Sequence, residues 1–311
     1  MQIGVDPRRA VAISGMATAS SVIRLLDGSR DREQIIAEAG QHGVPREVTE
    51  RILALLAAAG AVVDFPAEML RFVPPELRQR LMPVLATASL AAQDSDGGAS
   101  LIARRSSCTV QVSGRGPVAA LVADLLTSSG LAAAGTGSPQ EASQADLLVL
   151  VGRQSPAETA ELLRLRQPYL AVYAEEAIGV VGPLVRPGVT ACLRCIDLAK
   201  AERDPAWPLI LAQLAGRCAD PPGCDAVLAA AVAAQTAAQA VAFADRSHQA
   251  DATANGTLEL VLPSWQWRRR TWLPHPACAC GSHQAGQDRT GQYRPASREP
   301  EGMNAAGELR P

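Results

Sequence analysis

The chain has 311 residues, of which 48% are hydrophobic and 3% aromatic, so alanine, leucine and valine must fill the core of one large or two modest domains. A formal net charge of −2 gives no general attraction to nucleic acid or to anionic lipid, which argues against both classes of partner. The first residues lack the basic start and apolar run of a secretion signal, and seven cysteines without such a signal favour reduced thiols and metal ligation in a cytoplasmic protein.

Residues 1–65 have the pattern of a small domain with three short helices between strands. Asp31 can cap a helix with Gln34 three residues later, and Gly60 ends the apolar pattern of the last helix. The expected elements are a strand over 11–13, helices over 20–26, 32–39 and 45–59, and a strand over 61–63. This order predicts a winged helix-turn-helix.

A winged helix-turn-helix usually binds DNA, but the charge pattern argues against that function here. Residues 1–64 contain seven arginines, no lysine and eight acidic residues, and the expected recognition helix carries Arg46 and Arg51 beside Glu47 and Glu50. A DNA reader needs a basic stripe to displace counterions. A zinc-containing transcription regulator therefore stays only as an alternative, to be tested by DNA binding.

Residues 66–100 form a linker with a helix over 76–92, and a second domain is expected over 101–283, followed by a disordered tail over 284–311. An alternation of strands and helices predicts an α/β fold with a Rossmann-like sheet. The long alanine-rich stretch over 226–244 predicts a buried helix and no membrane span. The expected strands lie over 109–112, 147–151, 169–173, 178–185, 257–262 and 267–273, the last two as a hairpin.

Two short-spaced cysteine pairs predict a metal centre in the second domain. Cys192 and Cys195 follow one expected strand, and Cys278 and Cys280 follow another. Four soft thiolates brought together form the tetrahedral cage that Zn²⁺ prefers in closed structural sites. Free thiols and a redox pair remain as the alternatives, although a redox pair would be expected near the first strand of its domain.

Together these residues resemble the ThiF/MoeB superfamily, which has the ubiquitin-activating-enzyme fold. The segments 182–195, 204–208 and 275–280 are similar to one branch, the ThiF-like leader-peptide-binding partners of YcaO-type cyclodehydratases. Residues 1–65 resemble the PqqD-like recognition element of those proteins. The resemblance implies a precursor leader peptide and a YcaO-type enzyme as partners, and a homodimer joined through the sheet-bearing domain.

Active members of the superfamily adenylate a carboxylate with ATP, which they hold with a glycine loop, an acidic residue and basic residues. Gly114, Gly116 and Ala119 keep the loop pattern after the first strand of the second domain, but no matching acidic or basic segment follows. Such glycines also serve close packing of a helix on a strand. We therefore expect a relic loop, no ATP and no catalytic residue, with an adenylyltransferase as the alternative.

The remaining cysteines and one histidine have modest expected roles. In some relatives the region of Cys218 and Cys224 carries a catalytic cysteine, but no activating neighbour is evident, so both are expected to be loop thiols. Cys108 is expected to act as a small hydrophobic residue, and His275 to stabilise the turn before the second cysteine pair.

The sequence thus predicts a non-catalytic adaptor for a peptide-modifying enzyme. The small domain would take an extended leader peptide as an added strand, with main-chain hydrogen bonds setting its register. Apolar side chains would then provide selectivity, and the expected peptide-binding residues are Val48, Ile52, Leu55 and Val62. A stand-alone relative with no peptide substrate is a further alternative.

Overall fold

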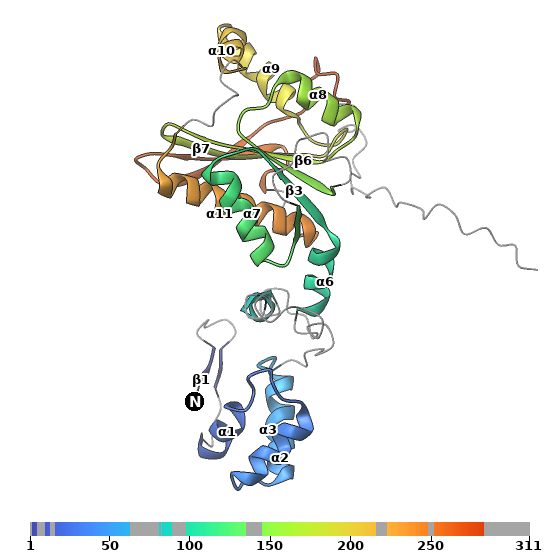
Figure 1. The fold of residues 1–311 in the computed structure, drawn as a ribbon, viewed down its shortest axis with the longest axis vertical. Helices are drawn as coiled ribbons and strands as arrows, with labels where there is room; N and C mark the ends of the chain where they lie inside the picture. The colour runs from blue at the N-terminus through green and yellow to red at the C-terminus, as the bar shows by residue number, and fades with distance from the viewer. Residues whose placement is uncertain are drawn as a thin grey trace, which may run out of the picture. The chain divides into compact units, whose positions relative to one another are not determined.

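A computed structural model describes residues 2–4, 10–12, 16–62, 81, 83–88, 98–134, 145–215, 223–247 and 252–282. The chain forms two compact units, drawn in Figure 1. The first comprises Met1–Val110, Ala123–Ala134 and Phe243–Arg246, and the second comprises Gln111–Val122, Gly135–Ala242 and Ser247–Pro311. The expected tail over 284–311 and most of the expected linker lie outside the described residues, although residues 83–88 are helical.

The N-terminal part begins with a two-stranded antiparallel hairpin, β1 (Gln2–Ile3) and β2 (Val11–Ala12). Three helices follow: α1 (Met16–Ile23), α2 (Arg32–Gln41) and α3 (Arg46–Ala58). Helix α1 starts earlier than the sequence pattern predicted. Their apolar faces enclose a small core made of Val22, Leu25, Ile35, Ala39, Val44 and Leu53.

Local capping determines where these helices begin and end. The Asp31 carboxylate accepts a hydrogen bond from the Gln34 backbone at 2.8 Å, and the Gln34 side chain accepts one from the Asp31 backbone at 3.0 Å. This capping box was predicted from sequence. Pro45 is the N-cap of α3 rather than its first helical residue.

The prediction of a strand over 61–63 is wrong for Ala61 and Val62, which are not in a strand; Val63 lies outside the described residues. The reason is the end of α3. Gly60, with a φ of +65°, donates to the Ala57 carbonyl, and the Ala61 backbone donates to the Leu56 carbonyl at 2.9 Å. This Schellman motif engages the backbone N–H of Ala61, which would otherwise be available to pair in a strand.

The main sheet has seven strands in the order β4-β3-β5-β6-β7-β8-β9. Strand β5 pairs parallel with β6. From β6 to β9, each strand pairs antiparallel with the next strand along the chain. The sheet therefore combines parallel pairing of β5 and β6 with an antiparallel extension. Its strands are β3 (Thr109–Ser113), β4 (Ala132–Ala134), β5 (Leu147–Val151), β6 (Tyr169–Glu175), β7 (Ile178–Val185), β8 (Gly256–Val261) and β9 (Gln266–Thr271).

Helices cover both faces of this sheet, with α8 and α9 on one face and α7 and α11 on the other (Figure 1). Helix α11 is long and apolar enough to cross a membrane by length and composition, but half of its apolar window is buried within the fold. Gly179 of β7 leaves room for it, because a Cβ there would collide with Val232 of α11. The helices are α6 (Ala99–Ser107), α7 (Pro117–Ser128), α8 (Pro156–Arg164), α9 (Leu193–Arg203), α10 (Trp207–Ala215) and α11 (Ala226–Ala244).

The glycine loop after β3 is held by packing against the neighbouring strand β5. Gly114 has a φ of +139°, and a Cβ built on it would collide with the backbone oxygen and side chain of Val151. Ala119, in the first turns of α7, is 1% exposed. Gly114 is therefore explained by the close approach of this loop to β5.

Replacing Gly114 with alanine should destabilise the folded chain by about 2–4 kcal/mol, because the new Cβ adds both overlap with Val151 and backbone strain. Chemical denaturation of the purified protein measures this cost. The exposed neighbour Arg115 provides the control, since Arg115→Ala should change the free energy of unfolding by less than about 0.5 kcal/mol. Equal stability of Gly114→Ala and wild type would contradict the packing role.

Candidate metal centre

The first cysteine pair is positioned by the turn that leaves β7. Thr190 organises this turn: its hydroxyl accepts from the Arg186 backbone at 2.8 Å and donates to the Leu184 carbonyl at 3.1 Å. Cys192 then serves as the N-cap of α9, and Cys195 lies in the first turn of that helix. Both side chains are therefore held at the N-terminus of a helix, where negative charge on sulfur is favoured.

The second pair follows β9 and is tied to the first by Asn255, just before β8. The side-chain oxygen of Asn255 accepts a hydrogen bond from the Ala191 backbone N–H at 2.7 Å. The backbone carbonyl of Asn255 accepts one from the Trp272 backbone N–H at 2.9 Å. Further along, the Ser282 hydroxyl donates to the Thr190 carbonyl at 2.8 Å. Hydrogen bonds on both sides of the cysteines thus hold the two loops together.

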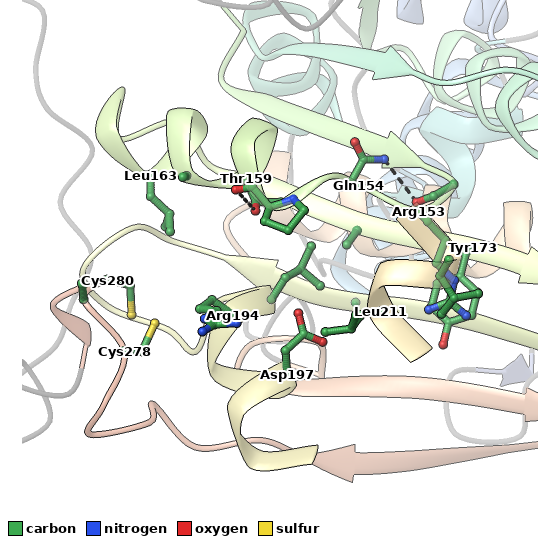
Figure 2. A pocket seen from close by; sticks show the side chains of 18 of the residues that line it. Arg153, Gln154, Thr159, Leu163, Tyr173, Arg194, Asp197, Leu211, Cys278 and Cys280 are labelled. Carbon is green, nitrogen blue, oxygen red and sulfur yellow. Dashed lines mark hydrogen bonds between the residues drawn. The ribbon is translucent and has the colours of Figure 1, made fainter. Parts of the chain in front are cut away.

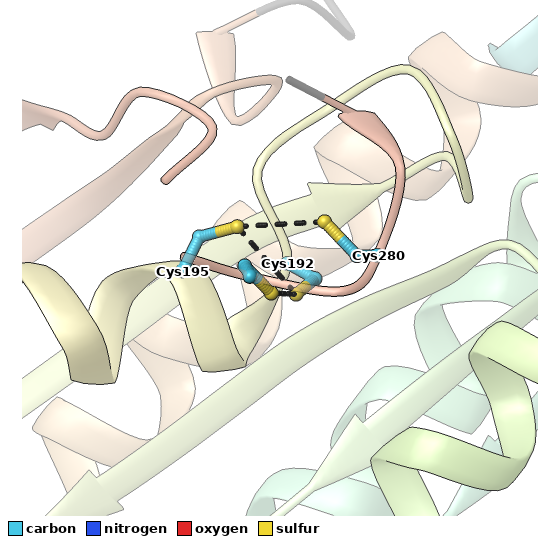
Figure 3. Close-up of side chains that lie close together, drawn as sticks. Cys192, Cys195 and Cys280 are labelled. Carbon is cyan, nitrogen blue, oxygen red and sulfur yellow. Dashed lines mark hydrogen bonds between the residues drawn. The ribbon is translucent and has the colours of Figure 1, made fainter. Parts of the chain in front are cut away.

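The four sulfur atoms come together as the sequence predicted (Figure 3). All four Sγ atoms lie within 4.8 Å of one another. Cys192 Sγ is 3.7 Å from Cys195 Sγ and 3.6 Å from Cys278 Sγ, and Cys195 Sγ is 3.5 Å from Cys280 Sγ. Tetrahedral Zn²⁺ with Zn–S bonds of about 2.3 Å would separate its sulfurs by about 3.8 Å. The donor set and its spacing therefore fit a metal ion.

Buried thiols this close cannot titrate independently. A hydrogen bond donated by the Cys192 thiol lowers the pKa of Cys195 to about 4, and the same contact raises the pKa of Cys192. Burial raises the pKa of Cys278 to about 11, partly opposed by the Cys280 backbone amide. The cluster thus favours some thiolate but resists full deprotonation, which a divalent cation would make favourable.

The residues near the cluster that could compete as ligands are engaged elsewhere. His275 Nδ1 accepts from the Ala277 backbone at 3.2 Å and stabilises the turn, whereas Nε2 lies 2.9 Å from Glu202 Oε1 on α9. Cys108 and Cys224 do not belong to the four-cysteine group. Cys218 lies outside the described residues.

A cavity of about 620 Å³, which the sequence pattern did not predict, adjoins the cysteine cluster (Figure 2). It opens at the carboxyl ends of β5 and β6, under α8, α9 and α10, and Cys278, Ala279 and Cys280 form one wall. Of the lining residues in the described part of the chain, none belongs to the glycine loop at 114–119. Its apolar wall includes Pro156, Ala160, Leu163, Leu193, Leu211 and Leu214.

Most charged groups at the inner end of this cavity have partners within the protein. The Arg153 guanidinium contacts both oxygens of Glu175 at 3.0–3.1 Å and stacks 4.1 Å from the Tyr173 ring. Burial raises the pKa of the Asp197 carboxyl, which accepts from the Trp207 indole at 3.1 Å.

Lys200 lies in the same region, with its ammonium nitrogen 4.3 Å from the Trp207 ring centroid and 5.7 Å from that of Trp272. Burial lowers its pKa, and the charge of Asp197 opposes that shift. Aromatic faces and one carboxylate thus stabilise the lysine charge.

The residues predicted to bind a peptide lie on or just after α3. Val48 and Leu55 are 39% and 61% exposed, so both present apolar surface to solvent. Ile52 instead packs against the small core, and Val62 is partly buried. The helix therefore offers an apolar surface of two residues spaced by two turns, with Ile52 beneath it.

No protein-family model matches the sequence, and no curated protein matches it significantly. Solved structures do match. The heterocyclase TruD is 20% identical, with a TM-score of 0.58 and a match that covers 92% of this chain and 41% of TruD. A heterocyclase in complex with substrate and cofactor is 15% identical, with a TM-score of 0.58, covering 92% of this chain and 38% of its own. Escherichia coli MccB, solved with AMPCPP and MccA, is 13% identical, with a TM-score of 0.52. The match covers 90% of this chain and 94% of MccB.

At these identities the matches show a shared fold, and they support the α/β architecture expected from sequence. The chain spans about two fifths of the length of the two heterocyclases. The winged-helix character of residues 1–65 stays a prediction.

Protein purified with zinc in the medium should carry one metal ion per chain, and Cys195→Ser should lose it and unfold at lower temperature, because metal-binding energy is folding energy here. Metal analysis and thermal unfolding measure both effects. Metal affinity should also fall as the pH is lowered, since protons compete for the four sulfurs.

Cys224→Ser, which removes a thiol outside the cluster, is the matched control and should retain the metal. Full metal occupancy in a protein lacking both Cys278 and Cys280 would show that the ligand assignment is wrong.

Proposed function

We propose that this protein is a non-catalytic adaptor, stabilised by zinc, that binds the leader of a ribosomally made peptide. It would present this peptide to a YcaO-type azoline-forming cyclodehydratase in the cytoplasm. The observation that carries this proposal is the fold shared with two heterocyclases over 92% of this chain, together with the four-cysteine cluster. In this proposal a second protein, the cyclodehydratase, supplies the chemistry.

The leader peptide would bind to the N-terminal part as an added strand. The short hairpin of β1 and β2 supplies a strand edge, and α3 supplies the exposed apolar side chains of Val48 and Leu55. Main-chain hydrogen bonds would set the register of the peptide, and the apolar side chains would select its sequence. In this role residues 1–65 would act as a PqqD-like recognition element.

Leu55→Asp should weaken binding of a leader peptide by about tenfold or more, because it places a charge where the peptide would bury an apolar side chain. Calorimetric titration of the full-length protein with candidate leaders measures the affinity. Arg51→Glu on the same helix, also exposed, is the control and should change the affinity only modestly.

A proline at a paired position of the peptide should weaken binding strongly, because it removes a main-chain donor. Binding of duplex DNA in preference to every candidate leader would favour the transcription-regulator alternative and overturn the adaptor proposal.

Adenylyl transfer is the second candidate function, because the match to MccB, solved with AMPCPP, covers 94% of that protein. Two observations argue against adenylyl transfer. Gly114 packs closely against Val151, and the Arg153 guanidinium is paired with the Glu175 carboxylate. We expect calorimetry with Mg-ATP to detect no binding in the micromolar range and peptide-dependent pyrophosphate release to be absent. Micromolar binding that Gly116→Asp abolishes would favour the enzyme instead.

We also propose that the protein is a homodimer, as expected from the ThiF-like resemblance and from the prevalence of twofold dimers among homo-oligomers. Light scattering should give twice the chain mass of 32.5 kDa. A monomer mass at high protein concentration would contradict the dimer.

A further inference from the structure

Tyr169, the first residue of β6, has a buried hydroxyl whose role the fold alone does not explain. The side chain is fully buried, at 0% exposure, and is among the largest buried side chains of the described chain. Its hydroxyl has no hydrogen-bond acceptor within the described residues. A buried hydroxyl without an acceptor is destabilising, so phenylalanine would pack in this position at lower cost.

The surroundings of Tyr169 indicate the missing acceptor. Tyr169 shares one buried cluster with Cys192, Cys195 and Cys278. Besides burial, the groups that act on the pKa of its hydroxyl are the Cys192, Cys280 and Cys195 sulfurs and the Leu193 backbone amide. A phenol hydroxyl carries its proton at neutral pH and can act as a donor.

The neighbouring sulfurs become good acceptors only when a metal is bound. A neutral thiol is a weak acceptor, whereas a metal-bound thiolate carries negative charge and accepts hydrogen bonds well. Four thiolates around one divalent cation leave the centre with a net negative charge inside the protein. A donor directed at one of them would reduce that charge, as outer-shell partners of metal ligands commonly do.

We propose that Tyr169 is a positioning residue of the metal centre, whose hydroxyl donates a hydrogen bond to a metal-bound cysteine thiolate, with Cys192 as the first candidate. This inference rests on the metal centre of the proposed function. It accounts for a polar group kept in an otherwise apolar cluster, because the acceptor is present in the metal-loaded protein.

The proposal predicts effects of opposite sign in the two states of the protein. Without metal, Tyr169→Phe removes an unpartnered hydroxyl and should leave thermal stability unchanged or raised. With metal, the same substitution removes a donor to the thiolate and should weaken zinc affinity by about 10- to 100-fold. A residue that serves only packing would change the stability of both states in the same direction.

The test uses the full-length chain, with zinc alone as the probe. Chelator competition gives the zinc affinity, and calorimetry of the metal-free protein gives its stability. Tyr173→Phe is the matched control, because it makes the same chemical change on the same strand beside Arg153 rather than the cysteines; it should leave zinc affinity unchanged. Substitution with Co²⁺ adds a spectroscopic readout, since loss of the hydrogen bond should shift the sulfur-to-cobalt charge-transfer band of Tyr169→Phe to lower energy.

The outcomes separate this inference from the metal centre itself. Weaker zinc binding in Tyr169→Phe, an undiminished metal-free stability and a shifted cobalt band would support the hydrogen bond. Zinc affinity within about threefold of wild type, or an unshifted band, would overturn it while leaving the metal centre intact. Failure of the wild-type protein to bind zinc would overturn the metal centre, and this inference with it.

Discussion

The second unit depends on the junction between the loop that follows β7 and the loop that follows β9. Cys192 and Cys278, 86 residues apart in sequence, bring their sulfurs to 3.6 Å, and Asn255 and Ser282 reinforce the same junction with hydrogen bonds. Tyr169 and Trp272 pack in the same buried cluster as Cys192, Cys195 and Cys278. A metal ion at the junction would convert its binding energy into folding energy.

The same junction shapes the cavity beside it. Because Cys278, Ala279 and Cys280 form one wall, the positions of α9 and of the second cysteine loop determine the width of the cavity. Arg153, which lines the cavity, is bound to Glu175. A cation paired in this way offers less free electrostatic attraction to an anionic ligand than an unpaired cation would.

Local signals in the sequence were reliable where short-range hydrogen bonds decide the structure. The capping box of Asp31 and Gln34 and the bounds of β5 and β7 follow from residue types within a few positions of one another. The strand predicted over 61–63 failed at Ala61 because the helix end at Gly60 took its backbone N–H. An apolar run after a glycine is compatible both with a strand and with a helix C-terminal motif. Only the geometry of the helix end distinguishes the two structures.

The sequence by itself determined the α/β alternation and the candidate ligand set, because periodicity and the spacing of Cys192, Cys195, Cys278 and Cys280 are local properties of the chain. The tertiary structure alone decided the sulfur separations, the role of Asn255, the cavity and the isolation of the Tyr169 hydroxyl. These features arise where strands distant in sequence end side by side, and no pattern of neighbouring residues encodes which side chains will then face one another.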